Sequence, residues 1–476
     1  MASAHDRHAT IAELSHGIAA GDLTADELLC ACLAAIEADR REELPLNAVR
    51  CVDPAARDRL EEAAGASPAD TGCLSGMPII DKDNIDVVGL PTTSGSQALA
   101  HAKPRRDATV IERLRTSGAV VIGKANMAEL SFDVRSRSSL GGDVRNPFRR
   151  TVTSGGSSGG TAAAVAAGFA VAGLGTDTGG SIRNPAGFAG LVGLRPTHGR
   201  VPLDGVAPLS PTTDTVGPIA RSVADAALLF AVLTGRPPAP APAGMVKGRR
   251  VGVLRQFAGR DPAVSAALAN VLSALRNEGA TIVDPLLLPD DIVPGPGRPH
   301  IVDAEFVPAF DAYLAAAFAP SAHIRLPRSI AAIVATGEYL EELRSVLHAR
   351  LDPTTRSPAA WKSIIEARGA ILASLTAMMA EHGLDAFAYP TSAMPATSLA
   401  KPQSGWAPEL AAMTGWPAMS VPGGLADNGV PLGVDLLARA NDEPLLFDLG
   451  AAVERVLGPR PLPRPAPEPA GRTIRT

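Results

Sequence analysis

Two stretches rich in glycine and serine stand close together and could carry out covalent chemistry. Residues 154–160 read SGGSSGG, and residues 175–183 read GTDTGGSIR. In the second stretch, two glycines let the backbone bend so that successive N–H groups converge on one point. N–H groups arranged in this way stabilise the oxyanion that forms when a carbonyl is attacked. Ser181 is therefore a candidate nucleophile. The candidate oxyanion donors are Thr178, Gly179 and Gly180.

The first stretch allows three interpretations. A helix is predicted to begin near Gly159, so Ser157 and Ser158 lie at its N-terminus, where negative charge is favoured. A phosphate site is one hypothesis, although the lysine of a phosphate-binding loop is missing. A nucleophile elbow, G-x-S-x-G, is the second, and it fits through either serine. The third is a tight turn into the helix with no chemistry of its own.

A serine nucleophile needs a base, and no histidine lies in or between the two stretches. A lysine can serve when burial makes its neutral form accessible. In GMPIIDKDN (76–84), a short apolar strand delivers Lys82 at its end, and Lys124 follows another predicted strand and is the alternative. The pair Asp177 and Arg183 is predicted to form an ion pair that holds the glycine turn.

Helices that end in glycine and run into short apolar strands must position these side chains. Thr24 opens a predicted helix with a capping box. A helix over 109–117 is followed by a strand over 119–122, and the same order recurs at 263–284 and before the strand 385–390. Alternation of this kind predicts α/β layers around a sheet.

The composition excludes several classes of function. The chain has 476 residues, a net charge of −5 and 4% aromatic residues. It has no basic field for nucleic acid or for an anionic membrane. The four cysteines show no zinc pattern. The N-terminus does not resemble a signal peptide, and the apolar run 161–175 is too short to span a bilayer. We therefore expect a soluble cytoplasmic protein with no metal.

Taken in order, several phrases make the chain resemble the amidase signature family, from GMPIIDKDN to LARANDEPLL (437–446). Ser157 and Ser181 also have the spacing that the family uses. The matching phrases in between are GKANMAE (123–129), GGSSGG (155–160), GTDTGGSIR (175–183), GLRPTHGRVP (193–202), DTVGPIARSVADAALL (214–229) and PAMSVPGG (417–424).

This resemblance implies an α/β fold, an α/β/α sandwich around a large mixed β-sheet. It implies one domain over 1–457. The N-terminal helical segment would cover about 1–70, the signature core about 71–235 and further α/β units 245–457. The proline-rich tail 458–476 is expected to be extended and unstructured.

The resemblance also implies the chemistry. Ser181 would be the nucleophile, Ser157 the bridging serine in a cis peptide environment, and Lys82 the base of a Ser-cisSer-Lys triad. Ser158 and Thr176 would support their hydrogen bonds. The reaction would be hydrolysis of a carboxamide through an acyl-enzyme, with no cofactor. The partner would be a small amide substrate, and a homodimer is expected from the family.

Three alternatives remain at this stage. The chain could be the glutamine-hydrolysing A subunit of a tRNA-dependent amidotransferase, although GEYLEELRSVLHARL (337–351) does not match that subunit's tyrosine-rich region. It could be a non-catalytic binding protein on this fold. It could also be an α/β-hydrolase with Ser158 as nucleophile and a distant histidine. Small neutral aliphatic or aryl carboxamides are the expected substrates. Residues 128–136, 405–416 and the region 300–350 are expected to line the pocket.

Overall fold

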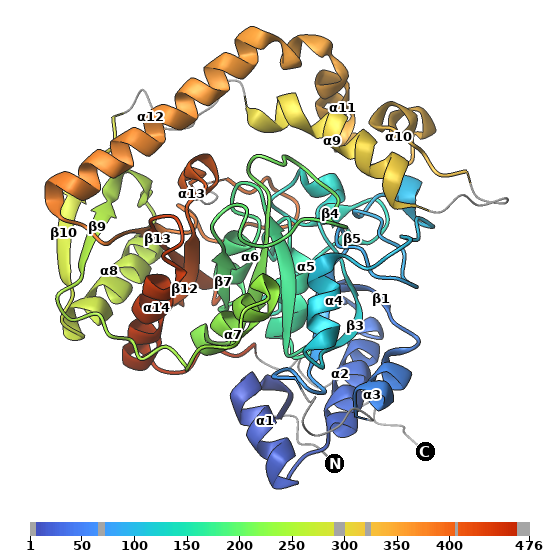
Figure 1. Cartoon of the computed structure of the whole chain (residues 1–476), viewed down its shortest axis with the longest axis horizontal. Coiled ribbons are helices and arrows are strands. Elements are labelled where there is room, and N and C mark those ends of the chain that lie inside the picture. Colours follow the sequence, from blue (N-terminus) through green and yellow to red (C-terminus); the bar gives the residue numbers. More distant parts are fainter. Residues whose placement is uncertain (1–5, 65–71, 290–299, 319–324, 405–407, 464–476) are drawn as a thin grey trace, which may run out of the picture.

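An eleven-stranded mixed sheet runs through the molecule (Figure 1). The computed structural model describes residues 6–64, 72–289, 300–318, 325–404 and 408–463. The strand order is β1-β3-β2-β6-β8-β7-β12-β13-β11-β9-β10. The strands are β1 (Val49–Val52), β2 (Pro78–Lys82), β3 (Val120–Ala125), β6 (Ala172–Asp177), β7 (Val192–Arg195), β8 (Thr215–Ala220), β9 (Arg250–Leu254), β10 (Thr281–Leu286), β11 (Ala386–Pro390), β12 (Ala418–Leu425) and β13 (Pro431–Ala438). A small hairpin pairs β4 (Arg137–Ser138) with β5 (Gly142–Asp143).

Strand direction is mixed, as predicted. Strand β2 runs parallel to both β3 and β6, whereas β8 is antiparallel to both β6 and β7. Successive side chains point to opposite faces of a sheet. Accordingly, Ile79 and Val121 belong to one buried cluster, and Ile80 and Val120 belong to another. Two apolar faces require a helical layer on each side.

Helices cover both faces and so confirm the predicted α/β fold. One face packs against α4 (Thr109–Thr116), α7 (Val223–Thr234), α8 (Pro262–Asn277) and α14 (Glu443–Leu457). The other packs against α5 (Gly159–Ala166), α6 (Arg183–Phe188), α12 (Pro358–His382) and α13 (Leu410–Thr414). The N-terminal helices α1 (Ile11–Ala20), α2 (Ala25–Arg40) and α3 (Ala56–Ala64) pack at the β1 end of the molecule.

A further group of helices lies over one end of the sandwich, above the strands in Figure 1. It consists of α9 (Ile301–Ala317), α10 (Ile330–Thr336), α11 (Arg344–Leu351) and the start of α12, which share a buried cluster. Among the described helices, α12 is long and apolar enough to cross a membrane by length and composition. Its buried residues Ile364, Ile371, Leu375 and Met379 pack against the protein's own core.

The local signals in the sequence place most elements correctly. Thr24 caps α2 with a complete capping box, as predicted. The strand expected at 119–122 is β3, which extends to Ala125 because its far end pairs with both β1 and β2. The predicted loop 293–299 and most of the predicted tail lie outside the described residues. Residues 458–463 are described, and several of them line a pocket considered below.

Candidate active site

The ammonium group of Lys82 lies at the meeting point of the two glycine-rich stretches. Lys82 is the last residue of β2, and its side chain is fully buried. Lys82 Nζ lies 2.6 Å from Ser157 Oγ and 2.7 Å from Thr176 Oγ1. Asn84 Nδ2 also donates to Thr176 Oγ1, at 3.1 Å. Strand β2 thus brings its terminal lysine to the serine just before α5 and the threonine near the end of β6.

Backbone contacts fix Ser157 in place. The peptide bond between Gly156 and Ser157 is cis, the environment that the resemblance implied. The Ser157 carbonyl accepts hydrogen bonds from the Ala128 N–H and the Ser136 hydroxyl, both at 3.1 Å. Ser158 Oγ donates to the Thr176 carbonyl at 3.2 Å and accepts from the Thr176 N–H at 3.3 Å. The Ser158 hydroxyl is therefore committed to joining α5 to β6.

Ser181 sits beside this pair, in the turn after β6. The N–H of Ser158 donates to the Ser181 carbonyl at 3.2 Å, which ties the two stretches together. Ser181 is partly exposed and lines a pocket together with Thr178, Gly179 and Gly180. Its hydroxyl makes no hydrogen bond to the described part of the chain, so it is not bonded to Ser157 in this structure.

One expected oxyanion donor is engaged elsewhere. The N–H of Gly180 donates to Asp177 Oδ1 at 2.8 Å, and the φ of Gly180 is 132°, a conformation that favours glycine. This N–H satisfies the buried carboxylate and does not point to the pocket as expected. The N–H groups of Thr178, Gly179 and Ser181 have no partner among the described residues, so they remain candidate donors.

Burial makes the neutral form of Lys82 accessible. Desolvation lowers the pKa of Lys82 to about 7, against the opposing effect of Asp214 and Asp177. Burial also raises the pKa of Asp214 to about 6, although Thr178 Oγ1 donates to that carboxyl at 2.5 Å. A buried lysine beside a carboxyl that is itself hard to ionise can lose its proton near neutral pH.

The predicted ion pair between Asp177 and Arg183 is present, with 3.1 Å between Arg183 Nε and Asp177 Oδ2. It belongs to a larger buried network. Arg195 lies 3.0 Å from Asp177, and Arg183 also pairs with Asp435 at 2.6 Å. Burial alone would raise the pKa of Asp177, but the two arginines hold it well below its usual range. This network fixes the turn that carries Ser181.

The alternative base, Lys124, lies in a different cluster. Its ammonium group donates to the Ile85 carbonyl and lies 4.0 Å from Asp83, which also pairs with Arg50. The strand register explains the separation, since Asp81 pairs with Lys124 and Lys82 pairs with Ala125. Neighbouring residues in register point to the same face, so the two lysines point to opposite faces of the sheet.

A pocket of about 430 Å³ opens over Ser181. Predicted segments contribute Ser131–Val134 from the stretch 128–136, and Val302 and Arg350 from the helical layer. Each charged side chain of this pocket has a partner within the protein. Asp133 pairs with Arg135 at 2.8 Å, His300 with Glu409 at 2.9 Å, and Arg350 with Asp303 at 2.9 Å.

Sequence reasoning did not single out several of these residues. Asp214 and Arg195 lie within the phrases DTVGPIARS and GLRPTHGRVP that carry the resemblance, so a closer reading of those phrases could have found them. Nothing local in the sequence marks Glu409 or His300, which are brought together from distant segments. Among the described residues, no group of three or more His, Cys, Asp and Glu side chains could hold a metal ion.

Comparison with known proteins agrees with this geometry. The sequence model of the family described as Amidase matches residues 27–447. The A subunit of glutamyl-tRNA(Gln) amidotransferase from Chloroflexus aggregans is 34% identical, over 94% of this chain and 96% of the relative. The peptide amidase structure from Stenotrophomonas maltophilia is similar with a TM-score of 0.84 and 31% identity, over 96% of this chain and 98% of that one. The structure of the corresponding amidotransferase protein from Thermotoga maritima has a TM-score of 0.73 and 26% identity, over 96% and 98%. The chain therefore belongs to the amidase signature family and is a hydrolase of C–N bonds.

Proposed function

We propose that the protein hydrolyses small neutral carboxamides through a serine acyl-enzyme. Ser181 is the nucleophile, Ser157 relays the proton, and Lys82 is the base. The observation that carries the proposal is the 2.6 Å contact of Lys82 Nζ with Ser157 Oγ, in a fully buried position next to the turn of Ser181. Among the described residues, the one histidine that lines the pocket is His300, whose ring bonds Glu409.

The proton moves along this chain of groups. Neutral Lys82 takes the proton of Ser157 while Ser157 takes the proton of Ser181, so that the Ser181 oxygen can attack the amide carbonyl. The N–H groups of Thr178, Gly179 and Ser181 are placed to bind the resulting oxyanion. The protonated relay then protonates the departing amine. Water repeats the sequence and releases the acid.

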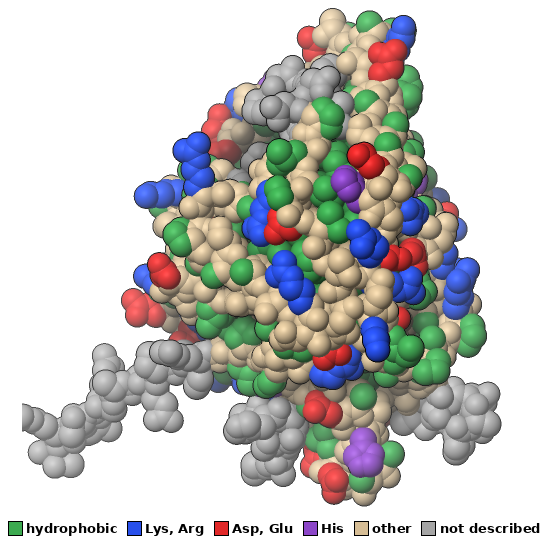
Figure 2. Space-filling model, turned by 90° about the vertical axis from the view of Figure 1, so that its left-hand side faces the viewer, with side chains coloured by type: hydrophobic (Ala, Val, Ile, Leu, Met, Phe, Trp, Pro, Cys, Tyr) green, Lys and Arg blue, Asp and Glu red, His purple; other side chains and the backbone are tan. Residues whose placement is uncertain are grey.

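Two observations support a neutral substrate. The charged side chains that line the pocket are each paired within the protein, so a charged substrate would have to break an existing ion pair. The face of the molecule displayed in Figure 2 carries basic and acidic side chains interspersed, with no extended area of one sign. That distribution supports a small-molecule partner over a nucleic acid.

A second candidate is the glutamine-hydrolysing component of an amidotransferase, because curated relatives such as that of Chloroflexus aggregans carry the amidotransferase name. The pocket gives it less support. Arg350, the pocket's one arginine among the described residues, is already paired with Asp303 and lies 4.5 Å from the centre of the Phe132 ring. No tyrosine lines the described part of the pocket.

Labelling with a fluorophosphonate tests the proposal. We expect one adduct on Ser181 by intact mass and peptide mapping, loss of that adduct in Ser181→Ala, and much slower labelling in Lys82→Ala. The exposed Ser273 of α8 gives the control variant Ser273→Ala, which should label like the wild type. Benzamide, butyramide, a short C-terminally amidated peptide and glutamine should then be compared. Turnover of glutamine alone, or only after a second protein copurifies, would favour the amidotransferase instead.

A further inference from the structure

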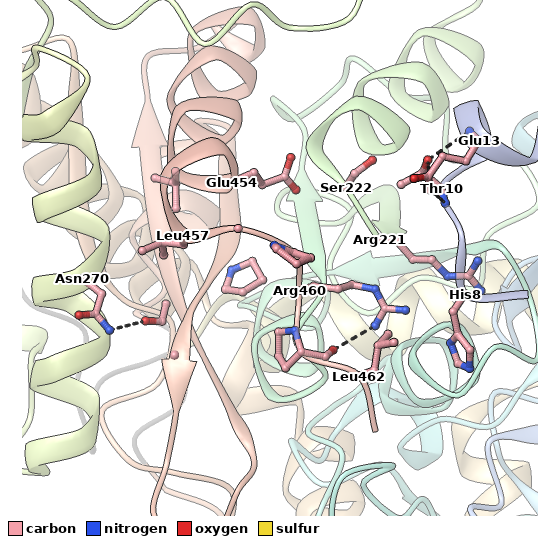
Figure 3. A pocket seen from close by; sticks show the side chains of 17 residues that line it. His8, Thr10, Glu13, Arg221, Ser222, Asn270, Glu454, Leu457, Arg460 and Leu462 are labelled. Atoms are coloured by element: carbon pink, nitrogen blue, oxygen red, sulfur yellow. Dashed lines mark hydrogen bonds between the residues drawn. The ribbon is translucent and has the colours of Figure 1, made fainter. Parts of the chain in front are cut away.

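A second pocket, of about 640 Å³, lies away from the catalytic serines (Figure 3). Strand β8 joins the two places. Asp214, which bonds Thr178 at the catalytic turn, precedes this strand, and Arg221 follows it. A six-residue strand is roughly 20 Å long. The second pocket shares no lining residue with the pocket over Ser181.

Two arginines without acidic partners meet in this pocket. Arg221 is buried, and its terminal nitrogens donate to the carbonyls of Ala9, Val165 and Ala170, which leaves Nε buried without a partner. Arg460 Nη1 donates weakly to the Pro461 carbonyl at 3.4 Å, and its Nη2 is buried without a partner. In the described part of the chain, neither guanidinium forms an ion pair with a carboxylate.

The two guanidinium groups carry like charges at close range. Figure 3 shows the Arg460 side chain extended toward Arg221 and His8. Burial lowers the pKa of Arg460 to about 9, and the charge of the neighbouring Arg221 acts in the same direction. Buried cations normally bind a counter-charge, and buried N–H groups normally have an acceptor. An oxyanion in the pocket would supply both.

The acidic groups of the pocket do not provide that counter-charge. Glu13 accepts hydrogen bonds from the N–H and the hydroxyl of Thr10, both at 2.8 Å, within the capping box of α1. Glu454 accepts the Val223 N–H at 2.8 Å, and burial raises the pKa of Glu454 to about 7. Both acids are therefore used in holding helix ends. The rest of the wall is largely apolar and includes Val453, Leu457, Leu462 and the prolines Pro422, Pro459 and Pro461.

We propose that this pocket binds an organic anion, with a carboxylate or phosphate group bound by Arg221 and Arg460 and an apolar part along Val453 and Leu457. Guanidinium groups bind both kinds of oxyanion through charge-assisted hydrogen bonds. The apolar wall favours a substituted anion over a bare one.

Calorimetric titration at constant chloride tests this site. The probes are benzoate, phenyl phosphate, inorganic phosphate and, as the neutral match, benzyl alcohol. We expect saturable binding of benzoate or phenyl phosphate at one site, weaker binding of inorganic phosphate and none of benzyl alcohol. Arg460→Gln should weaken the bound anion at least roughly tenfold, and Arg460→Lys should weaken it less. The exposed Arg439 precedes α14 and gives the control Arg439→Gln, which should bind like the wild type.

The outcomes separate clearly. No saturable binding of any anion to the wild type would overturn the proposal, as would binding that Arg460→Gln leaves unchanged. Equal binding of benzyl alcohol and benzoate would also overturn it, because the pocket would then be merely apolar. Preference between benzoate and phenyl phosphate identifies the anionic group. None of these results depends on amide turnover.

Discussion

Lys82 Nζ and Ser157 Oγ lie 2.6 Å apart although 75 residues separate them in the chain. The lysine is shielded from bulk solvent, since its side chain is fully buried at the end of β2. The contact therefore couples the protonation state of one lysine to the serine that stands beside the nucleophile. Two consequences follow for measurements that vary pH, one on catalysis and one on folding.

The rate should depend on the neutral form of Lys82. Because desolvation lowers the pKa of Lys82 to about 7, we expect kcat/KM for a neutral amide to fall about tenfold per pH unit below pH 7 and to level off above it. The measurement is a pH profile of kcat/KM from pH 5 to 9. Full recovery of activity on return to pH 8 excludes acid unfolding as the cause.

A profile that stays flat down to pH 5 would contradict this assignment. His300 also faces the pocket, and Glu409 raises the pKa of that imidazole against the effect of burial, which favours the neutral ring. The variant His300→Gln separates the two groups, because it should retain the acid limb of kcat/KM if Lys82 causes it.

The same lysine should make stability depend on pH. In the unfolded chain Lys82 binds a proton up to its ordinary pKa near 10.5, whereas in the folded protein it loses the proton near pH 7. Between these values the unfolded state binds more protons, so the free energy of unfolding of the wild type should rise with pH by up to about 1.4 kcal/mol per unit. Lys82→Met lacks this contribution. Denaturant unfolding of both proteins at pH 7, 8 and 9 should show the difference growing in favour of the wild type.

The exposed Lys362 of α12 provides the control, since its side chain is 76% exposed. Lys362→Met should differ from the wild type by the same amount at all three pH values. If the difference between the wild type and Lys82→Met also stays constant, Lys82 keeps its proton in the folded protein and its role as a base fails.

The groups around the two serines could be predicted because each phrase carries its own local signal. Glycines mark the turn at Ser181, and an apolar strand leads into Lys82. The choice of Lys82 over Lys124 rested on resemblance, because both lysines end strands. What separates them is the register of β2 against β3, which depends on pairing across some 40 residues and leaves no mark near either lysine.

The charges around the pocket could not be predicted for a related reason. The sequence shows no acidic or basic cluster, and yet His300 meets Glu409 and Arg350 meets Asp303 beside the pocket. Such pairs join segments that only the packed helical layer brings together. Likewise, the engagement of the Gly180 N–H by Asp177 follows from the backbone conformation at Gly180, which glycine permits without dictating it.

The buried network behind Ser181 should contribute strongly to stability. Arg183→Met would leave Asp435 without its arginine and Asp177 with Arg195 alone. Removing one partner of a buried pair typically costs about 3–5 kcal/mol, because a charge stays buried without compensation. We expect a fall of this size in the free energy of unfolding, measured by urea denaturation. The exposed pair of Arg344 with Glu341 gives the control Arg344→Gln, which should leave the urea midpoint nearly unchanged. Equal effects of the two variants would mean that the network does not hold the fold.

Two glycines should respond in opposite ways to alanine. Gly369 lies on the exposed side of α12, and a Cβ there would meet no atom within 4 Å. Gly369→Ala should therefore raise the free energy of unfolding by about 0.4–1 kcal/mol, because it restricts the unfolded chain and suits a helix. A Cβ on Gly160, at the start of α5, would lie 2.0 Å from the Asn126 carbonyl oxygen. The backbone cannot yield there without moving Ser157, so Gly160→Ala should lose at least about 1–3 kcal/mol together with fluorophosphonate labelling. If Gly160→Ala kept both its stability and its labelling, the close packing of α5 against the loop after β3 would be wrong.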